Sequence, residues 1–210
     1  MGFTIFPGIP AVLLNLYLLR LGYEAQFIGM VSGLASLGYA LFCLPSAAMG
    51  NRWGIRHMMI AGLSLCMIGY GVLPLAAAIP AGLRGAWIIA IRLAISLGST
   101  LYFVNFRPFL MAISSPDERT HVFSMRSALQ PVGAFLGSLV AGVLPGVLAG
   151  ALGLTLRDSL PYGLPISLSA LILLPALWAM RKMRDVTIER PKHDPTKVAR
   201  KGDSPLKTLV

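Results

Sequence analysis

A few polar side chains stand inside long apolar segments of this sequence, and their types could do chemistry there. Polar groups are costly in hydrocarbon, so those that persist in an apolar segment are candidates for a functional site. A cation in such a segment usually faces a polar cavity rather than lipid. The candidates for a solute-binding site are Arg92, Asn15, Tyr39, Asn105 and Arg107.

Each candidate also has a purely structural interpretation. Asn15 could bond a neighbouring helix, Tyr39 could pack at an interface, and Arg107, beside Pro108, could extend its guanidinium to the headgroups. The structural role is favoured for all of them except Arg92, for which both interpretations stay open.

A short charged turn, residues 50–57, lies between two apolar runs and carries a second group of candidates. Gly54 permits a tight reversal of the chain, and Asn51 can form hydrogen bonds beside it. Arg52 and Arg56 could bond helix C-terminal carbonyls or acids on adjacent helices, in a contact that forms in one conformation and breaks in another. Alternatively, both arginines only determine the topology of the chain in a membrane.

The sequence offers little for an enzymatic site. His57, His121 and His193 all fall in predicted connections or in the tail. The spans contain no Gly-x-Ser-x-Gly elbow, no pair of acids and no His-Glu-x-x-His metal motif. An intramembrane hydrolase needs a nucleophile beside a base, so it is a weak alternative, and we expect neither a metal nor a cofactor.

Composition places the chain in a lipid bilayer. It is 56% hydrophobic and 12% charged, with a mean hydropathy of +0.73, which is too apolar for a soluble domain of this length. The net charge of +10 fits cationic residues beside membrane spans better than nucleic-acid binding. Cys43 and Cys66 both fall in apolar segments, where we expect them to pack rather than to form a disulfide.

Apolar runs near the 20 residues that cross a bilayer predict an all-α membrane protein with a bundle of six transmembrane helices. Their expected bounds are 2–19, 27–49, 58–80, 86–113, 122–148 and 162–180. The bundle would therefore occupy residues 1–180, and the basic segment 181–210 would be a flexible cytoplasmic linker or tail that meets anionic headgroups.

The positions of the cations predict the orientation. On one side, Arg52 and Arg56 lie in a connection, Arg119 and Arg126 lie in or beside another, and the basic tail follows. The connections on the other side contain only Arg20, Arg84 and Arg157. By the positive-inside rule both termini lie in the cytoplasm, of a plasma or inner membrane.

Two local patterns predict helix boundaries and helix packing. Ser115 and Glu118 have the spacing of a capping box, so the fifth span should begin there. Small residues allow helix backbones to approach each other in lipid. They recur at Gly29, Gly33, Gly133, Gly137 and Gly142.

The charged turn resembles the signature between the second and third helices of the major facilitator superfamily, Gly-x-x-x-Asp-Arg-x-Gly-Arg-Arg. Arg52, Gly54 and Arg56 match it. The positions that depart from it are Ala47, Asn51 and Ile55. Since Asn51 lacks the charge of the family's aspartate, the resemblance implies a weaker conformational latch here.

Other segments agree with that family. Arg92 and Gly98 are similar to its fourth-helix arginine–glycine pattern, residues 116–119 to the connection before its fifth helix, and the glycines of 133–142 to its fifth-helix motif. The resemblance extends from about Leu18 to Met180.

The resemblance implies a carrier of twelve helices in two halves, which binds a small solute between them and alternates by rocking one against the other. This chain would supply the N-terminal half, and its partners would be the lipid bilayer, the solute and a C-terminal six-helix half. Substrate and coupling ion are not identified by the sequence, and no acidic residue lies deep in a span. The alternative is a six-helix scaffold or assembly subunit that transports nothing.

Overall fold

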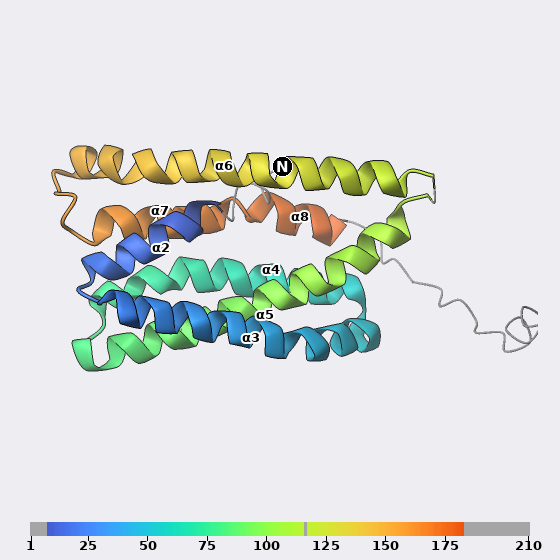
Figure 1. Cartoon of the computed structure of the whole chain (residues 1–210), viewed down its shortest axis with the longest axis horizontal. Coiled ribbons are helices and arrows are strands. Elements are labelled where there is room, and N and C mark those ends of the chain that lie inside the picture. Colours follow the sequence, from blue (N-terminus) through green and yellow to red (C-terminus); the bar gives the residue numbers. More distant parts are fainter. Residues whose placement is uncertain (1–7, 116, 183–210) are drawn as a thin grey trace, which may run out of the picture.

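The long helices of this protein run roughly along one axis (Figure 1). The computed structural model describes residues 8–115 and 117–182. Within them the elements are α2 (Gly8–Arg20), α3 (Ala25–Trp53), α4 (Ile55–Val72), the 3-10 helix η1 (Leu73–Ala78), α5 (Ala81–Ile113), α6 (Arg119–Leu152), α7 (Leu160–Leu171) and α8 (Leu174–Lys182). The predicted all-α fold is confirmed.

Five helical stretches are long and apolar enough to cross a membrane, namely α3, α4 with η1, α5, α6, and α7 with α8. The first predicted span, 2–19, corresponds to α2, an apolar helix with 13 described residues. Residues 2–7 of that predicted span lie outside the described part of the chain. The protein is therefore a multi-pass helical membrane protein.

The turn before α6 differs from the sequence prediction. Ser115 Oγ donates a hydrogen bond to Glu118 Oε2 over 2.8 Å. Glu118, at the N-cap position of α6, makes no side-chain hydrogen bond to the helix backbone, and the helix begins at Arg119. The predicted capping box is wrong, because the hydroxyl and the carboxylate bond each other instead of the backbone.

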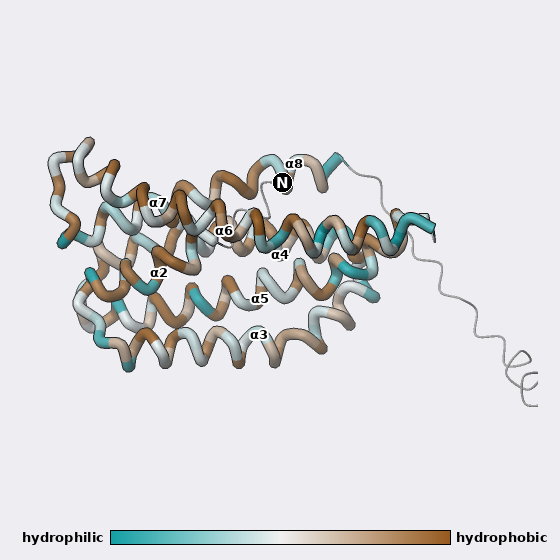
Figure 2. Tube along the Cα trace, turned by 45° about the horizontal axis from the view of Figure 1, so that its top comes forward, coloured by the Kyte–Doolittle hydropathy of each residue, from teal (hydrophilic) through white to brown (hydrophobic). Residues whose placement is uncertain are grey.

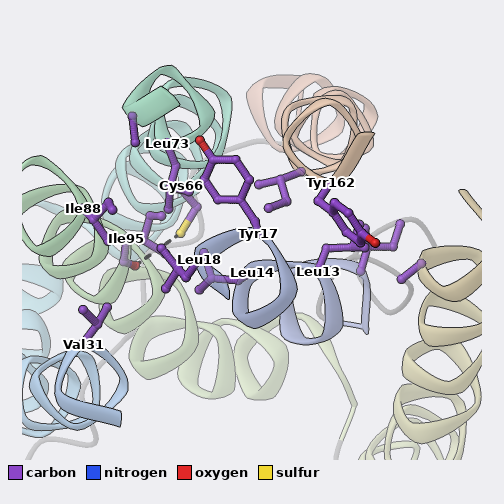
Figure 3. Close-up of a cluster of buried hydrophobic side chains, with 14 of the residues drawn as sticks. Leu13, Leu14, Tyr17, Leu18, Val31, Cys66, Leu73, Ile88, Ile95 and Tyr162 are labelled. Carbon is purple, nitrogen blue, oxygen red and sulfur yellow. Dashed lines mark hydrogen bonds between the residues drawn. The ribbon is translucent and has the colours of Figure 1, made fainter. Parts of the chain in front are cut away.

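The long helices form two groups of three, with α3, α4 and α5 in one group and α2, α6 and α7 in the other. α5 packs against α3 and α4, α2 packs against α6 and α7, and contacts between α4 and α7 join the two groups. A cluster of buried apolar side chains lies between them (Figure 3). It includes Leu13, Leu14, Tyr17 and Leu18 of α2 and Val31, Leu73, Ile88, Ile95 and Tyr162 of the other helices.

Small residues allow α6 to approach α2. Every fourth residue of α6 is buried along one stripe, which consists of Gly133, Gly137, Ala141, Pro145 and Ala149. The packing role predicted for the first two of these glycines is therefore confirmed.

Three other glycines do not support the packing prediction. No atom lies within 4 Å of where a Cβ would stand at Gly29, Gly33 or Gly142. All three are exposed on the surface of the described bundle. The prediction that they bring helices of this chain together is wrong, because the rotation of α3 and α6 turns them away from their neighbours.

Hydrophilic stretches lie mainly toward the two ends of the bundle, with apolar stretches between them (Figure 2). One end carries the α3–α4 connection at Gly54, residues 114–115 and 117–118, and the last turn of α8 (Figure 1). The opposite end carries residues 21–24, 79–80 and 153–159. We refer to these as the Gly54 end and the Arg157 end.

Candidate functional site

Arg92 of α5 lies half-buried beside a cavity of about 360 Å³. The side chains that line this cavity come from four helices, so it is a property of the bundle rather than of one segment. We call it the Arg92 cavity. Its lining is Pro10, Ala11, Leu14, Asn15, Ser32, Leu63, Cys66, Tyr70, Arg92, Ser99, Tyr102 and Phe103.

A second cavity, of about 320 Å³, adjoins the first. The two share Tyr70, Arg92 and Ser99, and the second is also lined by Ser36 and Tyr39 of α3. The structure therefore brings three sequence-predicted residues, Arg92, Asn15 and Tyr39, around two adjoining cavities.

The guanidinium of Arg92 is incompletely satisfied. Its Nε is buried and has no hydrogen-bond partner among the described residues. The hydroxyl of Tyr70 is near enough to interact electrostatically with it. A buried donor without an acceptor is costly, so this position favours a bound group that accepts a hydrogen bond or carries negative charge.

Close packing of α4 on α5 positions the floor of the Arg92 cavity. Gly62 and Gly98 face each other, and a Cβ at Gly62 would stand 2.5 Å from the carbonyl oxygen of Gly98. One turn away, Cys66 Sγ lies 3.6 Å from the Ile95 carbonyl oxygen (Figure 3). The same sulfur lies 3.5 Å from Ser99 Oγ. These contacts fix the rotation of α5 that turns Arg92 and Ser99 toward the cavity.

Asn105 is placed in the interface between α5 and α3 rather than beside these cavities. It is buried, and its Nδ2 donates to the carbonyl oxygens of Leu101 at 2.9 Å and Ser46 at 3.3 Å. Its side chain rests against Gly50, where a Cβ would overlap it. This geometry supports the packing interpretation of Asn105.

Arg107 lies apart from Arg92, toward the Gly54 end. Its side chain is exposed and lines a third cavity of about 440 Å³ with Tyr39, Arg126 and Gln130. Tyr39 thus lines both the second and the third cavity.

The charged turn is shorter than the sequence predicts. α3 continues through Asn51 and Arg52 to Trp53, and only Gly54, with φ of 90°, separates it from α4. Left-handed φ values favour glycine, which explains the residue type at the break. The prediction of an eight-residue turn is wrong, because both helices extend into it.

Arg56 joins the start of α4 to the end of α8. Its Nε donates to the Met180 carbonyl oxygen at 3.0 Å, and its Nη2 donates to that of Arg181 at 2.6 Å. The last carbonyls of a helix have no partner within it and carry the negative end of its dipole. Arg56 therefore has the kind of contact that the sequence suggests for it.

Arg52 and Asn51 are exposed in the last turn of α3. The guanidinium carbon of Arg52 lies 5.9 Å from the centre of the Trp53 ring.

Sequence reasoning missed several residues of the cavities. Ser32, Ser36 and Tyr39 follow the spacing of one helix face, and so do Arg92, Ser96 and Ser99. That periodicity was the available signal. Tyr70, Cys66 and Tyr102 gave none, because single tyrosines and cysteines in an apolar span are ordinary packing residues.

Comparison with known proteins agrees with the all-helical membrane fold. The sequence model of the Major Facilitator Superfamily matches residues 1–209. Proteins named multidrug resistance protein MdtH from Yersinia enterocolitica, Yersinia pestis and Yersinia pseudotuberculosis are each 24% identical to this chain over 139 residues. These matches cover 66% of this chain and 32% of each relative. No solved structure matches.

Proposed function

Because this chain belongs to the Major Facilitator Superfamily, we propose that it supplies the N-terminal half of a secondary carrier that moves a small solute by alternating access. Members of this family are typically transporters rather than enzymes. The second half would be another six-helix bundle, which would close the cavity from the opposite side.

The observation that carries this proposal is the unsatisfied Nε of Arg92 at a cavity lined by four helices. Leu14, Leu63 and Phe103 supply an apolar wall, while Asn15 and Ser99 supply hydrogen-bonding groups. A small solute with an apolar body and an acceptor or anionic group fits such a lining.

Exposed polar residues at the rim of the second cavity support the proposal that a second six-helix half packs against this one. Ser36 and Tyr39 line this cavity on α3, yet both are exposed in the described bundle. A polar surface on a membrane helix is costly against lipid. A second bundle packed over α3 would cover these groups and complete the binding site.

Arg56 would act on the conformational equilibrium. Its bonds to the last carbonyls of α8 tie α4 to the sixth span at the Gly54 end. We propose that Asn51, Arg52, Gly54 and Arg56 form a switch that stabilises one of the two alternating states. Because Asn51 is uncharged, this switch depends on hydrogen bonds and on the two arginines.

We also propose that the Gly54 end faces the cytoplasm, in a plasma or inner membrane. Arg52, Arg56, Arg119, Arg181 and Lys182 gather there, as the positive-inside rule requires. Residues 183–210, which lie outside the described part, would then form a cytoplasmic linker between the two halves.

Uptake into liposomes tests the proposed function. Proteoliposomes with the complete carrier would be compared with proteoliposomes that contain residues 1–210 alone. The panel of solutes begins with amphipathic drugs, since the relatives that match this chain are named multidrug resistance proteins. We expect saturable transport by the complete carrier and none by the half.

Two outcomes would overturn parts of the proposal. Saturable transport by residues 1–210 alone would indicate a homodimeric carrier instead of a half. Absence of transport by the complete protein, with correct membrane insertion, would favour a scaffold that carries nothing.

A further inference from the structure

The third cavity, of about 440 Å³, has two cations in its wall. We call it the Arg107–Arg126 cavity. Its lining comes from three helices and consists of Tyr39 of α3, Phe103, Val104 and Arg107 of α5, and Arg126 and Gln130 of α6. Arg107 lies six residues before the end of α5, and Arg126 seven residues after the start of α6, which places each about 10 Å inside the Gly54 end.

The guanidinium of Arg126 lies over an aromatic ring. Its central carbon lies 4.1 Å from the centre of the Phe106 ring, within the range of a cation–π contact. A guanidinium over an aromatic ring can still use the N–H groups at its edge, which form the fork that matches a carboxylate or phosphate. Arg126 is also half-buried, so its side chain is more ordered than one on a free surface.

No carboxylate faces the two arginines across this cavity. The acids of residues 8–115 and 117–182 are Glu24, Asp117, Glu118 and Asp158, and none of them lines it. Arg107 and Arg126 are near enough to act on each other electrostatically. Two like charges at one cavity repel each other, and an anion between them would turn this repulsion into attraction.

We propose that Arg107 and Arg126 bind an anionic group, a carboxylate or a phosphate, in this cavity. The Gln130 amide and the Tyr39 hydroxyl supply further hydrogen-bond donors. Phe103 and Val104 provide an apolar wall for the rest of the ligand. The site shares Phe103 with the Arg92 cavity and Tyr39 with the second cavity, but it has its own pair of cations, Arg107 and Arg126. Its ligand binding does not depend on the transport function proposed above.

Thermal unfolding of residues 1–210 in neutral detergent tests the site. Benzoate and inorganic phosphate serve as probes, and chloride at matched ionic strength serves as the reference. We expect at least one probe to raise the unfolding temperature in a saturable way. Arg107→Gln and Arg126→Gln should each raise the half-saturating concentration on the order of tenfold, because a hydrogen bond to a charged group contributes on the order of that factor.

Arg157→Gln is the matched control. It removes the same charge from an exposed position at the opposite end of the bundle. Its half-saturating probe concentration should therefore equal that of the parent. If loss of the Phe106 contact prevents Arg126→Gln from folding, Arg107→Gln decides alone, because its side chain is exposed. Equal half-saturating probe concentrations in Arg107→Gln, Arg126→Gln and Arg157→Gln would overturn the proposal.

The source of the anionic group is distinguished in lipid nanodiscs. The chain would be compared in phosphatidylcholine alone and in phosphatidylcholine with phosphatidylglycerol. Stabilisation by phosphatidylglycerol but not by soluble probes, lost in Arg107→Gln, would support the site and assign it to a lipid headgroup. No stabilisation of the parent by either soluble probe or by phosphatidylglycerol would overturn it.

Discussion

Gly62 of α4 and Gly98 of α5 meet backbone to backbone. A Cβ at Gly62 would stand 2.5 Å from the Gly98 carbonyl oxygen, and a Cβ at Gly98 would stand 2.8 Å from that of Gly62. Backbone atoms cannot rotate away as a flexible side chain does. This contact sets the distance between the two helices that position Tyr70 and Arg92, so the shape of the candidate site depends on it.

We predict that Gly62→Ala destabilises the bundle by about 1–3 kcal/mol, the usual cost of overpacking. Gly142→Ala is the matched control, because it also adds one methyl group within a helix but has open space around it. Both changes gain about 1 kcal/mol of helix propensity, so their difference isolates the contact. Unfolding in detergent measures it, and equal stabilities of the two variants would contradict the close approach.

A second prediction concerns the tie between α4 and α8. Arg56→Ala removes two hydrogen bonds to the carbonyl oxygens of Met180 and Arg181. We expect the amide hydrogens of α8 to exchange faster, because the free energy of opening this helix should fall by about 1.5–3 kcal/mol, the range for hydrogen bonds to charged groups.

Arg52→Ala is the comparison, since Arg52 is exposed and stacks near Trp53. Arg52→Ala should leave the rate of amide exchange in α8 unchanged. In the complete carrier, however, we expect Arg52→Ala to slow transport while membrane insertion stays intact. Unchanged exchange of α8 in Arg56→Ala would show that this contact does not hold the helix.

The orientation of the bundle gives a third prediction. In a background without Cys43 and Cys66, single cysteines at positions 84 and 157 should react with an impermeant reagent only from outside the cell. A cysteine at position 52 should react only from the cytosol. Labelling of position 84 from the cytosol would exclude the proposed topology.

Properties that depend on single segments were predictable from the sequence. The length of the apolar runs indicates the helical stretches, and the residue type of Gly54 marks the break between α3 and α4. The cations at the Gly54 end could likewise be assigned to one side by counting. The ends of the helices were predicted less accurately, because helices such as α3 and α5 continue through charged or proline-containing stretches once neighbouring helices pack against them.

Relationships between segments could not be predicted in the same way. Asn105 and Arg92 are both polar residues of one apolar run, yet Asn105 is satisfied by Leu101 and Ser46 while the Nε of Arg92 is not. The difference arises from the rotation of α5 against α3 and α4, which the spacing along α5 alone does not reveal. The same holds for Tyr70, which reaches Arg92 from another helix.

The final prediction is that Arg92→Met impairs solute binding more than folding. Methionine has a similar length but no donor, so the buried and unpartnered Nε is removed without leaving a large void. Replacing a buried charge by an apolar side chain of similar volume is often neutral or stabilising. We therefore expect an unfolding temperature equal to or above that of the parent.

Arg84→Met is the matched control for this change. Arg84 donates from Nε and Nη2 to the Ile79 carbonyl oxygen at 3.3 and 3.1 Å, so its loss should lower stability by about 1–3 kcal/mol and leave binding intact. Affinity for a solute identified in the uptake panel would be measured on the complete carrier, with an expected loss on the order of tenfold or more for Arg92→Met. If Arg92→Met bound the solute like the parent and was merely less stable, the guanidinium would serve the structure of the bundle through Tyr70 and not the solute.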